Sequence, residues 1–314
     1  MSTVEHATQA TQGGGGMSRT RKIVLGVAFI YLAGLVAFAA IFGIKGHKNE
    51  QFKVIDSFHL ESWLKIAGPI QLDKGVLYLL LATGITLAIM LFVARHMQKR
   101  PGRMQVAVEA GYELMSKVTR ENMSEKLAKK WFPLVFTLFV FILVSNLIGY
   151  IPLPVDSENT FKVFGASIPS FQIYAAVTNV AVPLVLALGV FVAYNVEGVR
   201  THGGFGYLKS LIPAGVGGPM LILIFPLEIL SNFVLRPLSL TIRLWANLLA
   251  GHLLIEFMAG NLAVLLGLQL LGWFTLPLGV IIFLFEAVLI AGLQAFIFAI
   301  LTAIYIGGAT SASH

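Results

Sequence analysis

Two arginines stand inside an apolar segment of this chain that is hydrophobic enough to enter a lipid bilayer. They are Arg236 and Arg243, and the same segment, residues 219–258, also contains Asn247 and His252. A cation at membrane depth costs at least ~3 kcal/mol on insertion scales, so it normally faces a partner or a water-filled cavity and marks an ion pathway. The segment is therefore predicted to serve ion movement rather than only to anchor the chain.

Helical spacing would place these polar side chains on two faces, because each residue of an α-helix turns by about 100°. Four of them are spaced by four, seven and four residues, which predicts a single stripe: Asn232, Arg236, Arg243 and Asn247. His252 lies nine residues after Arg243 and is predicted on the opposite face. For Arg236, near a possible helix end, snorkelling to the headgroup layer is the competing interpretation.

The composition is that of a polytopic membrane protein. Hydrophobic residues make up 57% and charged residues 12% of the chain, whereas soluble proteins average about a quarter charged. There is no cysteine, so a disulfide framework and a thiolate metal site are both excluded. The net charge of +7 does not indicate a nucleic-acid partner, because the basic residues flank hydrophobic spans and so report membrane topology.

The N-terminal region divides into a tail, an apolar run and a loop. Residues 1–22 are polar and contain four consecutive glycines, which predicts a disordered tail. Residues 23–44 are either an extra transmembrane helix with a cytoplasmic N-terminus or a signal peptide cleaved near residues 37–39. Residues 45–75 are then an external loop, and the main membrane domain is predicted to cover residues 76–314.

Three ordinary spans follow, at residues 75–94, 132–151 and 171–194. Asn179, inside the third, is expected to hydrogen-bond to another helix. Residues 104–131 have helical apolar spacing and predict a surface helix. The loops at 95–131 and 195–218 are richer in Lys and Arg than the loops on the other side, which places them, and both chain termini, in the cytoplasm.

The final third contains two much longer apolar segments, residues 219–258 and 277–306. As continuous helices they would reach ~60 Å and ~45 Å, against a hydrocarbon core of ~30 Å, so they must tilt. The predicted fold is thus an all-α polytopic membrane protein. It has about six membrane helices, and one of them is the extra N-terminal helix. The last two are long and steeply tilted, and a cytoplasmic surface helix completes the predicted fold.

Two runs carry a resemblance to a known family. LRPLSLTIRLWANLLAGHLL at residues 235–254 and LQAFIFAILTAIY at residues 293–305 resemble the two signatures of subunit a of bacterial F-type ATP synthases. The resemblance implies a proton-translocating stator in the bacterial inner membrane, which offers two offset half-channels to carboxylates on a rotating c-ring. It implies as partners the c-subunit ring, a b-type peripheral-stalk subunit, the other ATP synthase subunits and the lipid bilayer.

The resemblance also assigns site residues. Arg243 matches the arginine between the two half-channels, and its guanidinium is never deprotonated, so it can favour an ionised rotor carboxylate but cannot relay a proton. Asn247, one turn on, would face the same rotor interface, or form a packing hydrogen bond instead. Gln294 matches the glutamine opposite the arginine, where the two could hydrogen-bond, and Glu228 resembles the acid on the inner side.

His252 and Glu286 match an acid–histidine pair in the outer half-channel. Histidine titrates near neutral pH, so such a pair can pass protons; a core histidine with one satisfied hydrogen bond is the competing interpretation of His252. Glu286 precedes Gln294 by eight residues, one more than is usual in the family. This departure turns Glu286 by about 100° away from the expected face unless a bulge absorbs the extra residue.

The resemblance implies a non-catalytic subunit with no cofactor, no metal and no nucleotide site. The sequence contains no G-x-x-x-x-G-K-[ST] pattern, which agrees with that expectation. The alternative function is a self-contained secondary transporter or channel that uses an intramembrane arginine as an anion site. Transporters of this kind often show repeated halves, and no such repeat is visible here.

Overall fold

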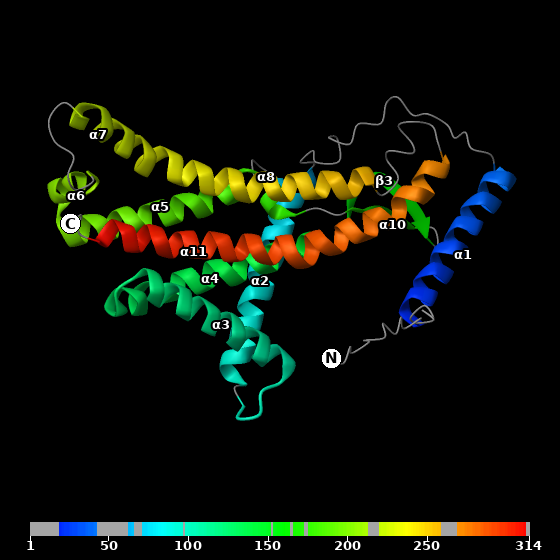
Figure 1. Cartoon of the computed structure of the whole chain (residues 1–314), viewed down its shortest axis with the longest axis horizontal. Coiled ribbons are helices and arrows are strands. Elements are labelled where there is room, and N and C mark those ends of the chain that lie inside the picture. The colour runs from blue at the N-terminus through cyan, green and yellow to red at the C-terminus, as the bar shows by residue number, and fades with distance from the viewer. Residues whose placement is uncertain are drawn as a thin grey trace, which may run out of the picture.

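A computed structural model describes most of the chain (Figure 1). The described residues are 19–42, 62–65, 71–96, 98–151, 153–163, 166–172, 175–212, 220–258 and 269–311. The predicted tail at residues 1–22 and external loop at residues 45–75 lie largely outside them.

Apolar helices dominate the described residues, and the all-α polytopic prediction is confirmed. Among the described residues, five helical segments are long and apolar enough to span a membrane: Gly75–Arg95, Glu125–Gly149, Ala181–His202, Met220–Ile255 and Pro277–Thr310. The first three belong to α2 (Lys74–Arg95), α4 (Glu125–Gly149) and α5 (Ala181–His202). The predicted N-terminal helix is present as α1 (Arg19–Phe42), which contacts α10.

Each of the two long segments consists of two α-helices joined by a π-helical turn. The first comprises α7 (Met220–Leu230), the π segment η3 (Ser231–Leu235) and α8 (Arg236–Glu256). The second comprises α10 (Gln269–Phe285), the π segment η5 (Glu286–Ile290) and α11 (Ala291–Thr310). Figure 1 shows the two running alongside each other while α2 crosses them steeply. The long pair is therefore inclined relative to α2.

Smaller elements connect the spans. They are α3 (Arg103–Asn122), the 3-10 turn η2 (Ala176–Thr178), α6 (Gly204–Ser210) and two antiparallel hairpins, β1 (Ser62–Lys65) with β2 (Gln71–Asp73) and β3 (Leu153–Val163) with β4 (Ala166–Gln172). The surface helix predicted over residues 104–131 ends at Asn122, and residues 125–131 already belong to α4.

The third span begins later than predicted, and the role expected for Asn179 is wrong. Residues 171–172 belong to β4, and α5 starts at Ala181. The side chain of Asn179 lies just before the helix and accepts a hydrogen bond from the Ala181 backbone N–H at 3.0 Å. Pro183 then falls in the first turn, where its missing N–H breaks no helical hydrogen bond.

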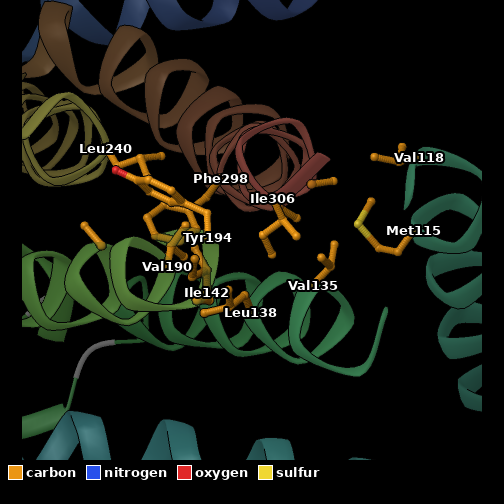
Figure 2. Packing of buried hydrophobic residues seen from close by; sticks show 14 of the residues in the cluster. Met115, Val118, Val135, Leu138, Ile142, Val190, Tyr194, Leu240, Phe298 and Ile306 are labelled. Atoms are coloured by element: carbon orange, nitrogen blue, oxygen red, sulfur yellow. The ribbon is translucent and has the colours of Figure 1, made fainter. Parts of the chain in front are cut away.

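The core lies where α11 packs against α3, α4 and α5, with α8 covering α5. Figure 2 shows Leu138 and Ile142 of α4, Tyr194 of α5 and Phe298 of α11 pointing into this shared interior. The inner face of the second long segment carries a small residue every fourth position, all of them buried: Ala291, Ala295, Ala299, Ala303 and Gly307. Small side chains let helix backbones approach closely, which is how membrane helices pack well.

Candidate functional site

The π segments change which residues share a face. In η5 the N–H of Ala291 donates to the carbonyl oxygen of Glu286, five residues back. Such a turn contains one residue more than an α-helical turn, so it absorbs a one-residue insertion. Glu286 and Gln294 are eight residues apart, yet both side chains are buried. The bulge that the sequence required for Glu286 is therefore present.

The η3 segment has a local cause in the sequence. The N–H of Arg236 donates five residues back to Ser231, and the next donor in that pattern would be residue 237. Residue 237 is proline and has no N–H, so the carbonyl oxygen of Asn232 lacks its helical partner. The hydroxyl of Tyr194 on α5 donates to it instead, which satisfies a buried backbone group as membrane interiors require.

Glu286 lies at the junction of α4, α8 and η5. The hydroxyl of Tyr150, the residue that ends α4, donates to Oε2 of Glu286 at 3.1 Å. The carboxyl group also lies directly against Gly251 of α8, in the space that a side chain there would occupy. An ionisable group that is nearly inaccessible to solvent is costly in a membrane unless polar groups surround it, and Tyr150 supplies one.

His252 is on the buried face of α8, only 3% exposed. Its Nδ1 lies 3.1 Å from the carbonyl oxygen of Leu248, and its Nε2 lies 3.3 Å from that of Gly149. An imidazolium can donate to both carbonyls, whereas a neutral ring has only one N–H. The ring is also packed against Tyr150, with centroids 5.0 Å apart. Glu286 and His252 thus lie at one junction, because Tyr150 contacts both.

Further polar atoms extend this junction along α4. The side-chain N–H of Asn146 donates to the carbonyl oxygen of Ala291, at 3.2 Å. Its Oδ1 and the hydroxyl of Ser145 are buried and, within the described part of the chain, have no hydrogen-bond partner. Buried polar atoms of this kind are ordinarily satisfied by water, which suits a wet path through apolar surroundings.

Arg243 and Asn247 lie on the other face of α8 and are exposed. Within residues 220–258 and 269–311, Arg243 makes no hydrogen bond or ion pair, and no hydrogen bond joins it to Gln294, which is buried. The contact suggested for these two residues is not formed here. The opposite facing of Arg243 and His252 agrees with their nine-residue separation.

The predicted single polar stripe is not observed, because Asn232 and Arg236 turn inward. Arg236 donates to Oδ1 of Asn232 at 2.6 Å and stacks over the ring of Tyr305 at 5.2 Å. Asn232 also donates to the hydroxyl of Tyr207 at 3.0 Å, and that hydroxyl donates to Asn195 at 3.0 Å. The π turn at Asn232 alters the angular step on which the stripe depended. Instead of snorkelling to the headgroup layer, Arg236 joins a polar cluster that connects α5, α6, η3 and α11.

Glu228 stands apart from these groups. It belongs to α7, three residues before η3, and it is half-buried. Within the described residues it makes no hydrogen bond or ion pair, so the structure does not bring it together with Arg243. The same residues contain no group of three His, Cys, Asp or Glu side chains able to hold a metal ion.

Sequence reasoning missed several residues of these clusters, among them Tyr150, Asn195 and Tyr207. Tyr150 had a usable signal, since it stands at the end of an apolar span and shortly before the sequence Pro152-Leu153-Pro154. Asn195 and Tyr207 had none, because nothing in their spacing connects the end of α5 with the short helix α6.

Known proteins resemble the chain over most of its length. The family model described as ATP synthase A chain matches residues 76–307. A protein named ATP synthase subunit a from Bradyrhizobium diazoefficiens is 39% identical over 249 residues, 78% of this chain and 90% of that protein. Proteins of the same name from Rhodopseudomonas palustris (strain BisA53) and Rubrobacter xylanophilus are 37% and 36% identical, covering 76% and 78% of this chain and 88% of each relative. The chain therefore belongs to the ATP synthase A chain family.

Proposed function

We propose that the chain is the proton-translocating stator subunit of the membrane sector of an ATP synthase. In this role it provides two offset half-channels, with Arg243 between them, to carboxylates on a rotating ring of c subunits. Protons that pass through turn the ring and drive ATP synthesis at other subunits. The chain itself has no catalytic role in this proposal and needs no cofactor.

The exposed position of Arg243 carries the proposal. The side chain projects from α8, an apolar helix whose outer face is exposed, for example at Ile242 and Leu254. A permanent cation on such a surface is costly in lipid, and within the described residues of this chain it has no counter-ion. A carboxylate on an adjacent membrane subunit would provide one.

Asn247 supports the same assignment, because it lies one turn further along the exposed face. A rotor carboxylate that approaches Arg243 would also lie near the amide of Asn247, because residues four apart share a helix face. The cation favours the ionised carboxylate and hence proton release beside it, and its permanent charge opposes direct passage of protons between the half-channels.

Glu286 and His252 form the outer half-channel in this proposal, and Asn146 and Ser145, one turn before the end of α4, extend it along that helix. Both titratable groups are buried at one junction, with polar atoms around them. Gln294 lies on the same buried side, two turns from Glu286. Glu228, on α7, is assigned to the inner half-channel through its position before η3.

The orientation follows from the basic residues. Arg95, Lys99, Arg100 and the basic residues of α3 flank the ends of α2 and α4, and the positive-inside rule assigns these ends to the cytoplasm. Both chain termini are then cytoplasmic, and the end of α4 at Tyr150 faces outward. The proposed partners are the c-ring on the Arg243 face, a b-type peripheral-stalk subunit near α3, and the remaining ATP synthase subunits.

The test is Arg243→Ala in the complete ATP synthase, compared with Ser239→Ala. Ser239 lies one turn earlier on the same exposed face and is uncharged, so it controls for changes to that surface. We expect R243A to assemble but to lose ATP-driven proton pumping in inverted membrane vesicles, while S239A pumps. Normal coupled pumping by R243A would refute the proposed role of this residue.

The alternative of a self-contained transporter is not favoured by any contact described above. It predicts that the purified chain alone transports a solute in liposomes. The proposed function instead predicts that the chain co-purifies with a small carboxylate-bearing ring subunit.

A further inference from the structure

We propose that Tyr150 is a positioning residue for proton translocation, whose hydroxyl holds the carboxyl group of Glu286 at the junction beside His252. This inference rests on the proposed function, in which Glu286 carries protons along the outer half-channel. It adds a third side chain to the acid and the histidine, one that does not itself transfer the proton.

The hydrogen bond joins parts of the chain that are far apart in sequence. Tyr150 ends α4 and is only 5% exposed, and Glu286 begins η5, 136 residues later. The contact thus fixes the acid relative to α4 rather than only within its own helix. Because a π turn is less regular than an α-helical one, an anchor from a neighbouring helix is valuable at this position.

The last residue of α4, Gly149, and the capping residue after it, Tyr150, contact the two titratable groups. The carbonyl oxygen of Gly149 faces Nε2 of His252, and the hydroxyl of the next residue, Tyr150, reaches Glu286. The carboxyl group is closed in from the third side by Gly251, the neighbour of His252. Three elements therefore converge on the acid and the histidine, and α4 contacts both.

A phenol suits an acid that changes its protonation state. Its hydroxyl donates a hydrogen bond to a carboxylate and can accept one from a neutral carboxylic acid. Tyr150 can therefore retain Glu286 in one place before and after proton uptake. A lysine or arginine there would be a fixed cation and would favour one state.

The ring and the hydroxyl of Tyr150 have separate contacts. The ring packs against His252 and, edge-on, against Phe283, whose centroid is 5.7 Å away. Tyr150→Phe therefore removes the hydrogen bond to Glu286 and keeps the packing. Tyr78→Phe is a matched control, because Tyr78 is also buried and its hydroxyl donates to the backbone oxygen of Ile151, at the same end of α4.

The experiment measures ATP-driven proton pumping by the whole complex in inverted vesicles, per assembled complex and over a range of pH. The titratable side chain that contacts Glu286 in the described structure is Tyr150, and His252 from α8 packs against the ring of that tyrosine. We expect Y150F to pump roughly tenfold to a hundredfold more slowly, the range that corresponds to losing a hydrogen bond to a charged group. Its pH dependence should also shift, since the carboxyl group loses its partner, while Y78F changes neither quantity.

Glu286→Gln separates the two proposals. If E286Q is impaired and Y150F keeps the wild-type rate and pH dependence, Tyr150 is not a positioning residue and the outer half-channel stands. A Y150F variant that only assembles in smaller amounts, with unchanged rate and pH dependence per complex, also overturns the inference, because the role is then structural. If E286Q pumps normally, the assignment of Glu286 fails, and the inference fails with it.

Discussion

The carboxyl group of Glu286 occupies the space where a side chain of Gly251 would begin. This contact joins η5 to α8 at the level of His252, the residue after Gly251. The absence of a side chain at residue 251 is therefore what allows an acid on one long helix to lie against the backbone of the other. Backbone sterics, rather than helix flexibility, explain a glycine in the middle of α8.

Gly251→Ala should displace Glu286 and impair proton pumping. The added methyl group would overlap the carboxyl group and must displace it, and a misplacement of about 1 Å can lower a rate by roughly 100-fold. Gly292→Ala is the matched control, because a Cβ atom there meets nothing within 4 Å and both changes bring the same gain in helix propensity, about 1 kcal/mol. Pumping per assembled complex checks the prediction. Equal rates for G251A and G292A would contradict it.

Gly307 and Gly308 should respond differently to alanine. A Cβ atom on Gly307 would collide with the backbone oxygen of Asn122, at the end of α3, whereas one on Gly308 meets nothing within 4 Å. We expect G307A to destabilise the packing of α11 on α3 by roughly 1–3 kcal/mol, the usual cost of overpacking, and G308A to be neutral. Thermal denaturation of the detergent-solubilised complex measures the difference. Indistinguishable midpoints for the two variants would show that α3 moves aside freely.

The sequence predicted that the chain consists of apolar helices and that Arg243 and His252 lie on opposite faces of one of them. Both predictions depend on regular helical periods. Apolar runs longer than a bilayer is thick also predicted the inclined pair, which Figure 1 shows beside the crossing helix α2. The resemblance placed Glu286 and His252 in one site, and the structure brings them to one junction through Tyr150. The functional roles of these residues stay predictions.

Irregular backbone limited what could be predicted. The stripe through Asn232 failed because a π turn precedes Pro237, and a constant angular step cannot anticipate that turn. The start of α5 was misplaced because a mostly apolar run begins at residue 171, but residues 171–172 pair as a strand. Contacts such as Tyr207 with Asn232 are tertiary, so no local pattern reports them.

Lys130 and Glu197 form an ion pair that links α4 to α5. The Glu197 side chain is 8% exposed and that of Lys130 is 45% exposed, so removal of the lysine leaves a buried carboxylate without its partner. We expect Lys130→Met to destabilise the subunit by roughly 1–2 kcal/mol, a value reduced because the lysine is half exposed. The double variant K130M/E197M should be more stable than K130M alone, because no unpaired charge remains. Thermal midpoints of the two variants test this order. A double variant less stable than K130M would mean that the unpaired Glu197 carboxylate costs little, because solvent screens its charge.

Tyr207 should make the attachment of α6 sensitive to alkaline pH. Burial raises the pKa of the Tyr207 hydroxyl above its ordinary value of 10.0, against smaller lowering effects from Asn232 and Arg236. The folded protein thus holds this proton more tightly than the unfolded chain. The resulting stability is fully present below pH 10 and is lost as the pH rises through the raised value.

Tyr207→Phe separates this effect from the titration of other groups. At neutral pH the variant loses the hydrogen bonds to Asn195 and Asn232, and leaving a buried amide unpaired costs about 1–3 kcal/mol. Between pH 8 and pH 11, however, Y207F should lose less stability than the wild type, because it has no proton to release at this position. Thermal midpoints of both proteins at the two pH values give the comparison. A wild type that loses no more than Y207F would show that the hydroxyl titrates as freely in the folded protein as in the unfolded chain.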